Sequence, residues 1–318
     1  MFNWFENLSH QITRIDTALL SNEFAACYVI ASNGEYALIE TGTHNTVQWI
    51  LRYLERHNIA FSQVKYVIPT HVHLDHAGGA GGLMQALPNA TLLIHPRGAR
   101  HMIHPEKLKA GAVAVYGEAE FAKHYGDVIP IEENRVIPME DESTVTLGNR
   151  TLTFYDTPGH AKHHFCVYDS ESQGIFTGDT FGIAYPTLST KQGPFIFPTT
   201  TPVQFDPVAL KNSIQRLVGL HPKVMYLTHY GPIKNPAQFE AELLEQIDDF
   251  AENALRISTA ESTENKENAL KAFMADYLID RALKKGCDKT PQQIQQALLM
   301  DIELNSQGLL VWLNQKAQ

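Results

Sequence analysis

The chain has 318 residues, and its 35 acidic side chains outnumber its 25 lysines and arginines, so its formal net charge is −10. A hydrophobic fraction of 44% with only 20 glycines and 16 prolines excludes collagen-like, disordered and disulfide-scaffold proteins. The excess of negative charge repels a phosphate backbone, so we expect no nucleic-acid partner. The length fits two domains, or one large domain with an appendage.

The three cysteines indicate a reducing compartment, because Cys27, Cys166 and Cys287 are odd in number and lack CxxC spacing. Cys27 and Cys166 lie in apolar runs and are expected to be buried, whereas Cys287 is expected to be exposed. The first residues lack a basic segment followed by an apolar one, and no run approaches the roughly 18 apolar residues of a membrane span. We therefore expect a cytoplasmic protein with no membrane partner.

Short β segments begin near residue 12, and Asn33-Gly34 supplies a turn that joins two of them into a hairpin. Residues 45–57 show helical spacing of apolar side chains and are followed by an apolar run at 64–70, which predicts a β-α-β unit. Residues 97–140 are less regular and predict helices and a loop. A second strand-rich stretch at 143–180 predicts a second sheet, so the two sheets imply a sandwich, followed by a helix at 207–219.

From Asn235 onward the chain is predicted to be helical, with apolar residues at intervals of three and four. Thr290-Pro291 is expected to supply an N-cap and a first helical position. We place the domain boundary near Pro236, which gives a domain of residues 1–235 and a helical C-terminal extension of residues 236–318. The apolar stripes of this extension are expected to form core or the surface of a homodimer.

Four residues of types that bind divalent metals fall within six positions, in a loop after an apolar strand: His71, His73, Asp75 and His76. In an extended loop, residues 71 and 73 point the same way while 75 and 76 diverge, so the spacing suits two neighbouring ions. Further candidate ligands follow other apolar runs, at His160, Asp179 and His229.

The motifs HVHLDH, TPGH, GDT and LTHYGP stand in the order of the ligand motifs of the metallo-β-lactamase-fold hydrolase superfamily, which residues 12–235 resemble. The resemblance implies an α/β fold, a four-layer αββα sandwich, with two divalent metal ions. Zinc is the expected metal, with iron and manganese as alternatives. The resemblance assigns His71, His73 and His160 to the first ion, Asp75, His76 and His229 to the second, and Asp179 to both. Glu40, where many relatives carry Asp, is expected to organise the site.

Such a pair of ions lowers the pKa of a shared water and polarises a carbonyl. The resemblance therefore implies a hydrolase that acts on a small-molecule carboxylic ester, lactone or thioester, with lactonase or esterase activity as the leading interpretation. Asp75 is expected to carry a proton to the leaving group as well as to bind metal. Tyr185 is expected to donate a hydrogen bond to the oxyanion, as a tyrosine does in related lactonases.

Two alternative functions stay open. One is a hydroxyacylglutathione hydrolase, although the sequence does not place the basic residues that hold glutathione. The other is a metal-bearing ligand-sensing or regulatory protein with little turnover. The substitution of Asp75 would separate an enzyme from a sensor, because a sensor would keep its partner binding.

Five more histidines lie near these motifs. His164 begins a predicted strand and is expected to be structural. His163 either supports the metal ligands from behind or has no role in the site, and the sequence favours neither. His95, His101 and His104 lack a carboxylate at ligand spacing, so we expect them to edge the site or to face solvent rather than to bind metal.

Overall fold

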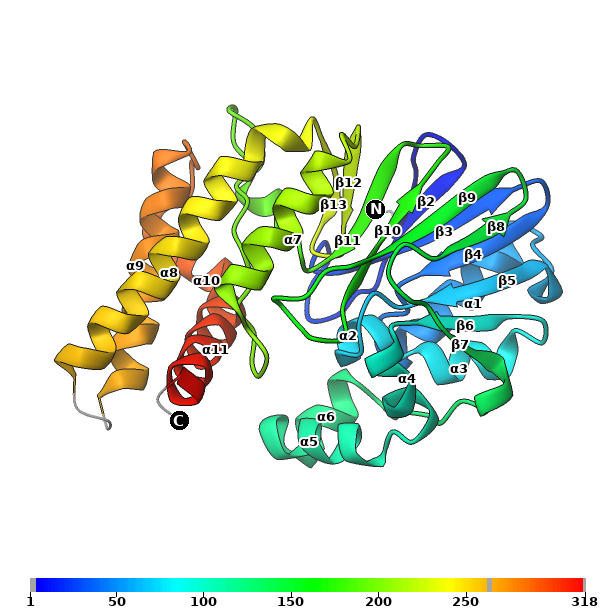
Figure 1. Cartoon of the computed structure of the whole chain (residues 1–318), viewed down its shortest axis with the longest axis horizontal. Helices are drawn as coiled ribbons and strands as arrows, with labels where there is room; N and C mark the ends of the chain where they lie inside the picture. Colours follow the sequence, from blue (N-terminus) through cyan, green and yellow to red (C-terminus); the bar gives the residue numbers. More distant parts are fainter. Residues whose placement is uncertain (1–3, 262–264, 317–318) are drawn as a thin grey trace. The chain divides into compact units, whose positions relative to one another are not determined.

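The computed structural model describes residues 4–261 and 265–316, apart from the side chains of residues 115 and 116. The chain forms two compact units (Figure 1). Unit 1 contains residues 1–156, 163–178 and 223–234, and unit 2 contains residues 157–162, 179–222 and 235–318. These units interleave along the chain, and the sequence-based domains of residues 1–235 and 236–318 stay a prediction.

The first sheet of unit 1 has seven strands in sequence order: β1 (Phe5–Asn7), β2 (Ile12–Asp16), β3 (Ala26–Ser32), β4 (Glu35–Ile39), β5 (Val64–Ile68), β6 (Thr91–Ile94) and β7 (Val136–Pro138). Strands β1 to β4 pair antiparallel, whereas β4 to β7 pair parallel. The hairpin predicted at Asn33-Gly34 joins β3 to β4 and is confirmed.

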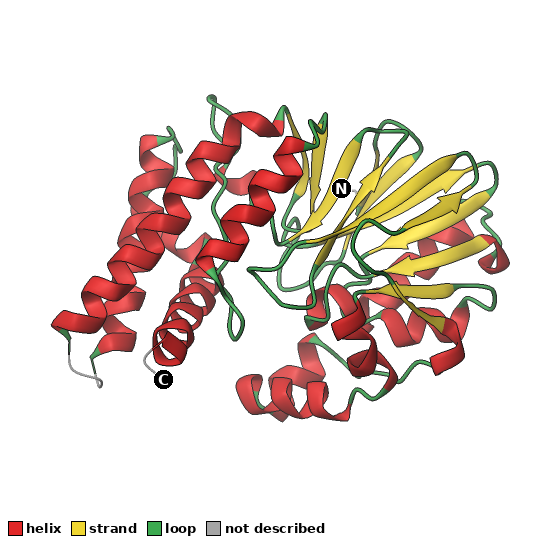
Figure 2. Ribbon diagram, viewed as in Figure 1, coloured by secondary structure: helices red, strands yellow, loops and turns green. Residues whose placement is uncertain are grey.

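Helical segments connect the parallel strands: η1 (His44–Thr46), α1 (Val47–Arg56), η2 (Phe61–Gln63), α2 (Leu74–Ala77), α3 (Ala80–Ala86), α4 (Pro96–Ile103), α5 (Glu106–Tyr116), α6 (Glu118–His124) and η3 (Glu133–Arg135). Buried Leu54 of α1, Leu83 of α3 and Met102 of α4 belong to one core with Val67 and Leu92 of the sheet. These helices therefore cover one face of the first sheet (Figure 2).

The second sheet has the order β13-β12-β11-β10-β9-β8 and confirms the second predicted sheet. Its strands are β8 (Thr144–Leu147), β9 (Arg150–Asp156), β10 (Phe165–Asp169), β11 (Gly174–Gly178), β12 (Val224–Leu227) and β13 (Gly231–Lys234). Side chains from both sheets, such as Tyr28 and Ile39 from the first and Phe154 and Phe176 from the second, form a shared apolar core. The two sheets thus make the predicted sandwich.

A buried arginine ties the two sheets together. Arg150 of β9 is 1% exposed, and its Nη1 lies 2.9 Å from Oδ2 of Asp169 on β10. Its Nη2 donates to the carbonyl oxygens of His10 and Ala31, and Ala31 belongs to the first sheet. Because a buried charge is costly unless it is paired, this guanidinium depends on two carboxylates, that of Asp169 and that of Glu171, whose Oε2 lies 3.0 Å from Nη2.

Unit 2 is helical, with η4 (Pro186–Leu188), α7 (Pro207–Gly219), η5 (Pro236–Phe239), α8 (Glu240–Ala260), α9 (Lys266–Lys284), α10 (Pro291–Ala297) and α11 (Leu299–Lys316). The helix predicted at 207–219 is confirmed, and the Asp206 side chain caps it by accepting from the N–H groups of residues 208 and 209. Thr290 caps α10 as predicted, in a capping box with Gln293. Within the described residues, no helix is long and apolar enough to cross a membrane.

The expectation that Cys287 is exposed is wrong, because the side chain is only 7% exposed. After α9 the chain folds back, and the Cys287 N–H donates to the Ala282 carbonyl at 3.0 Å. Cys27 and Cys166 are buried as expected. Burial raises the pKa of the Cys27 thiol well above its ordinary value, which keeps it protonated at neutral pH.

Helix α11 holds the segment that precedes α7 by direct backbone contact. The Asn305 side chain accepts from the Thr200 N–H at 2.7 Å, and Thr200 Oγ1 donates to the Asn305 carbonyl at 2.8 Å. A Cβ atom on Gly308 would lie 1.5 Å from the Thr200 carbonyl oxygen. Only glycine therefore permits this approach of helix and segment.

Candidate metal centre

The HVHLDH segment occupies the loop after β5 and the short helix α2, at the carboxyl end of a parallel strand. Its backbone is held by the loop that follows β4, since the Thr41 N–H and hydroxyl both donate to the His76 carbonyl, at 2.8 and 2.7 Å. A third bond runs from the Gly79 N–H to the Gly42 carbonyl at 2.8 Å. The ligand loop is thus fixed by backbone contacts between neighbouring strand ends.

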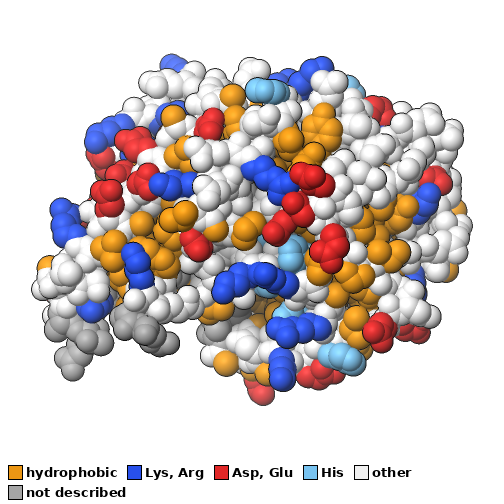
Figure 3. Space-filling view, in the orientation of Figure 1, with side chains coloured by type: hydrophobic (Ala, Val, Ile, Leu, Met, Phe, Trp, Pro, Cys, Tyr) orange, Lys and Arg blue, Asp and Glu red, His pale blue; other side chains and the backbone are white. Residues whose placement is uncertain are grey.

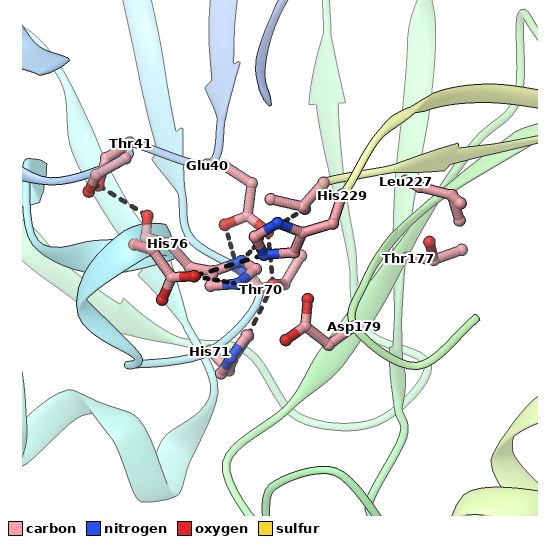
Figure 4. Close-up of polar contacts among 12 residues, drawn as sticks. Glu40, Thr41, Thr70, His71, His76, Thr177, Asp179, Leu227 and His229 are labelled. Atoms are coloured by element: carbon pink, nitrogen blue, oxygen red, sulfur yellow. Dashed lines mark hydrogen bonds and ion pairs between the residues drawn. The ribbon is translucent and has the colours of Figure 1, made fainter. Parts of the chain in front are cut away.

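Three predicted ligands of the second ion converge within unit 1, and Figure 4 labels two of them, His76 and His229. Oδ2 of Asp75 lies 3.6 Å from Nε2 of His76 and 3.3 Å from Nε2 of His229. The ligand atoms of these three residues all lie within 4.8 Å of one another. His229 follows β12 of the second sheet, so tertiary folding joins it to residues more than 150 positions earlier.

The other ring nitrogen of each histidine in this group has a hydrogen-bond partner. His76 Nδ1 lies 2.9 Å from Oε1 of Glu40, and His229 Nδ1 lies 2.8 Å from the Phe24 carbonyl oxygen. Because a carboxylate and a carbonyl accept, both rings donate through Nδ1 and present Nε2 as a lone pair. Metal-binding histidines have this arrangement, in which an outer acceptor fixes the ring and its tautomer.

Glu40 connects the bases of two ligand loops, as Figure 4 shows. Besides His76, Oε1 accepts from the hydroxyls of Thr70 at 2.6 Å and Thr228 at 2.9 Å, and Oε2 accepts from the Thr70 N–H at 3.0 Å. The side chain is 1% exposed, and the backbone has a φ of 63°. The sequence analysis missed Thr70 and Thr228. The signal was present, since each stands directly before a ligand histidine.

The remaining predicted ligands form one pair in each unit. In unit 1 the rings of His71 and His73 are 4.4 Å apart, and His71 Nδ1 lies 3.1 Å from the Thr70 hydroxyl. In unit 2, Nε2 of His160 lies 3.3 Å from Oδ2 of Asp179. Each pair places two ligand atoms within 4.8 Å of each other.

The chemistry of these donors fits a divalent metal ion. The donors are imidazole nitrogens and carboxylate oxygens, and no cysteine belongs to the groups found among the described residues. Zinc, iron and manganese all accept such donors. The outer contacts to Glu40 and Phe24 supply the support that metal-binding histidines require. The chain therefore contains His/Asp groups that could hold a divalent metal.

His163 and His164 both lie beside the predicted ligands. The His163 ring centre is 5.9 Å from that of His73, and the His164 ring stacks on His71 at 4.8 Å. Burial, with a smaller effect from the neighbouring His73, lowers the pKa of His163 to about 3. His163 is therefore neutral at physiological pH.

His95 does not face solvent, which was one of the two positions expected for it. It is 7% exposed, and its Nε2 lies 3.0 Å from Oδ1 of Asp156, a carboxylate remote in sequence. Its Nδ1 accepts the Arg97 N–H at 3.1 Å, so the ring also caps α4. The sequence could not place Asp156 here because β9 lies in the other sheet.

Tyr185 is buried in unit 2, where its hydroxyl donates to Oδ1 of Asp301 on α11 at 3.1 Å. No local sequence pattern indicates this partner, which lies 116 positions away. The role of Tyr185 as a donor to an oxyanion stays a prediction.

Comparison with known proteins identifies the family. The sequence model described as "Metallo-beta-lactamase superfamily" matches residues 21–229, more than half of the chain. The chain therefore belongs to the metallo-β-lactamase superfamily. It has the mixed α/β fold of that superfamily, with two sheets and a helical C-terminal region, as the sequence motifs implied.

One similar protein is the metallo-β-lactamase fold-containing protein ST1585 of Sulfurisphaera tokodaii. It is 27% identical over 230 residues, which cover 71% of this chain and 79% of ST1585. Its crystal structure superposes with a TM-score of 0.60 and 25% identity, covering 90% of this chain and 93% of that one.

Two other relatives are named as a thioesterase and as a hydroxyacylglutathione hydrolase. Thioesterase pkgB of Emericella nidulans is 27% identical over 180 residues, which cover 55% of this chain and 42% of pkgB. A hydroxyacylglutathione hydrolase of Hydrogenovibrio crunogenus is 27% identical over 133 residues, which cover 42% of this chain and 36% of the enzyme.

Proposed function

We propose that the protein is a two-metal hydrolase that cleaves a small-molecule carboxylic ester, lactone or thioester. The convergence of Asp75, His76 and His229, with both imidazoles fixed through Nδ1, is the observation that carries the proposal. A loop of surface histidines would not need a buried carboxylate and a backbone carbonyl to set the tautomers of its rings.

The ligand assignment of the complete site is part of the proposal and rests on family membership. One ion would take His71, His73 and His160, the other Asp75, His76 and His229, with Asp179 shared. Divalent ions held there would supply an activated water at neutral pH and polarise the substrate carbonyl.

The chain's own residues supply orientation and proton transfer. Glu40 and the Phe24 carbonyl hold the rings of His76 and His229, so no reorganisation is needed when substrate binds. Asp75 is 26% exposed, more than the other two members of its group. Its position beside both Nε2 atoms, with access to solvent, suits it to pass a proton to the leaving group.

Among ester-type substrates, thioesters have the most support, because one similar protein is named as a thioesterase and another as a hydroxyacylglutathione hydrolase, whose substrate is a thioester. Hydroxyacylglutathione hydrolysis is the second candidate activity, and regulatory binding with little turnover is the third. Zinc as the metal, cytoplasmic location and a homodimer formed through the C-terminal helices are part of the same proposal.

The test combines metal analysis with a substrate panel on protein purified without chelator. The panel contains an acyl-pantetheine thioester, S-lactoylglutathione, an acyl-homoserine lactone and a p-nitrophenyl ester. We expect about two metal equivalents and clear turnover of at least one substrate. His76→Ala should lose both, whereas His124→Gln, at a surface histidine that pairs with Glu120, should lose neither.

Two outcomes would contradict the proposal. Metal content far below two equivalents that added zinc or manganese does not restore would refute the two-metal site. Full metal loading without turnover of any substrate would favour the regulatory alternative.

A further inference from the structure

Helix α4 and the turn after it are unusually basic for this acidic protein. Residues 96–109, which include α4, the turn after it and the start of α5, contain four lysines and arginines, at positions 97, 100, 107 and 109, and one acidic residue, Glu106; of the four, Lys109 is paired with Asp127 at 2.6 Å. The whole chain, in contrast, has 35 acidic and 25 basic side chains. An exposed basic segment in a protein of net charge −10 creates a local site that attracts anions.

The buried face of α4 lies against the ligand loop. A Cβ atom on Gly98 would lie 2.9 Å from Cγ1 of Val72, the residue between His71 and His73. Met102, one turn later on the same face, is fully buried in the core of unit 1. Strands β5 and β6 are parallel, so the ligand loop after β5 and α4 after β6 begin at the same edge of the sheet.

Outside this buried face, α4 carries the exposed Arg97 and Arg100, and the partly exposed His101 borders the buried face. Arg100 Nε lies 3.4 Å from Nε2 of His101. Figure 3 shows Lys, Arg and His side chains close together over the region that α4 and α5 occupy in Figure 1. The Asp156 carboxylate contacts His95, which stands directly before the first residue of α4.

A row of imidazole rings connects this basic face to the predicted ligands. The His101 ring centre is 6.3 Å from that of His163, which is 5.9 Å from that of His73. Burial lowers the pKa of His101, and the nearby positive charge of Arg100 lowers it further. The His101 ring is therefore a neutral hydrogen-bond donor beside the permanently charged Arg100.

We propose that Arg100 and His101 bind the anionic part of the substrate, a phosphate or carboxylate on the thiol side of a thioester. The planar guanidinium suits both groups because it donates two parallel hydrogen bonds. The reacting carbonyl would then lie at the ligand loop while the charged end lies along α4. This inference rests on the proposed hydrolase function and deepens it by naming a charged substrate class.

The test compares thioesters that differ in the charge on the thiol side, two of which, acetyl-coenzyme A and S-acetylpantetheine, share the acetyl group. Acetyl-coenzyme A carries phosphates, S-acetylpantetheine is the same thioester without them, and S-lactoylglutathione carries carboxylates. The double variant Arg100→Gln/His101→Gln is compared with Arg256→Gln, an exposed arginine of α8 whose Nη2 contacts Asn253. Circular dichroism and metal content establish that each variant is folded and loaded.

We expect the double variant to raise KM for the favoured charged thioester on the order of tenfold, with kcat and the S-acetylpantetheine rate within about twofold. Added NaCl should raise that KM for the wild type and much less for the variant. If the double variant has a higher KM for acetyl-coenzyme A, the anion is a phosphate; if it has a higher KM for S-lactoylglutathione, the anion is a carboxylate. Equal effects on charged and uncharged thioesters, or no effect, would overturn the proposal.

Calorimetry with free coenzyme A and free glutathione separates this inference from the proposed function. If no thioester is hydrolysed but one thiol binds to the wild type and about tenfold more weakly to the double variant, the hydrolase proposal fails and the anion site stands. If S-acetylpantetheine is hydrolysed and neither thiol binds, the anion site fails and the hydrolase proposal stands.

Discussion

The replacement of Glu40 by alanine tests the most consequential contact of the candidate site. The substitution removes the acceptor of four hydrogen bonds, from the Thr70 N–H, the hydroxyls of Thr70 and Thr228, and His76 Nδ1. The two hydroxyls can rotate toward other acceptors. The Thr70 N–H and the His76 ring cannot, because backbone and helix α2 fix them.

The cost follows from those two stranded donors. A buried donor that loses its partner costs about 1–3 kcal/mol, so the free energy of unfolding should fall by about 4 kcal/mol. Glu40→Gly loses the same carboxylate but relieves the φ of 63°, and it should be less destabilised than Glu40→Ala by about 1 kcal/mol. The matched control is Glu35→Ala at the start of β4, the strand that Glu40 directly follows; the Glu35 side chain is 40% exposed, and its loss should cost under about 1 kcal/mol.

Urea unfolding of the metal-free proteins measures this cost without the stabilisation that bound metal adds. Metal content of the native proteins is measured in parallel, and we expect metal affinity to fall by about 10- to 100-fold because His76 loses its orienting partner. The reasoning is refuted if Glu40→Ala unfolds within about 1 kcal/mol of the wild type and retains its metal.

Four further changes test separate parts of the structure. Asp75→Ala should abolish turnover and reduce metal content to one equivalent or less, by elemental analysis, with His124→Gln unaffected. Asp169→Ala removes one of the two carboxylates paired with the buried Arg150 guanidinium, which keeps Glu171 at 3.0 Å, and should lower the free energy of unfolding by about 2–3 kcal/mol in urea, a loss that a neutral result would contradict. Gly308→Ala should lower the melting temperature, because its Cβ would overlap a carbonyl oxygen on the neighbouring segment; an unchanged melting curve would show that the contact relaxes freely. The Gly148 N–H, and to a smaller extent Lys65, lower the pKa of the Glu35 carboxyl below its ordinary value. The ionised carboxylate therefore stabilises the folded protein at pH values above the ordinary pKa, and this stabilisation is lost as the pH falls through the lowered pKa of the folded state. In Glu35→Gln the free energy of unfolding should therefore fall less than in the wild type between about pH 5 and pH 3, by a difference of under about 1 kcal/mol. The same pH dependence in both proteins would contradict the lowered pKa.

Local sequence patterns determined the elements and their chemistry. The Asn33-Gly34 hairpin, helix α7 at residues 207–219 and the Thr290 cap could be read directly, because turn and cap preferences act over a few residues. The HVHLDH segment also indicated its function directly, since four side chains of metal-binding types within six residues are uncommon without a metal.

Contacts between residues remote in sequence were decided by the tertiary structure. Cys287 looked exposed among charged neighbours, yet the chain after α9 folds back and buries it. His95 lacked a carboxylate nearby in sequence, but the second sheet brings Asp156 to it. Tyr185 likewise meets Asp301 only because α11 packs in the same unit.

Glu40 shows both sources of information at one residue. The sequence by itself determined that a carboxylate stands after an apolar strand, close to a cluster of metal-binding residues. Only the tertiary structure decided that this carboxylate binds Thr70, His76 and Thr228, which come from two sheets. The physical reason is that hydrogen bonds act over about 3 Å in space and have no dependence on separation along the chain, whereas sequence patterns report only neighbours.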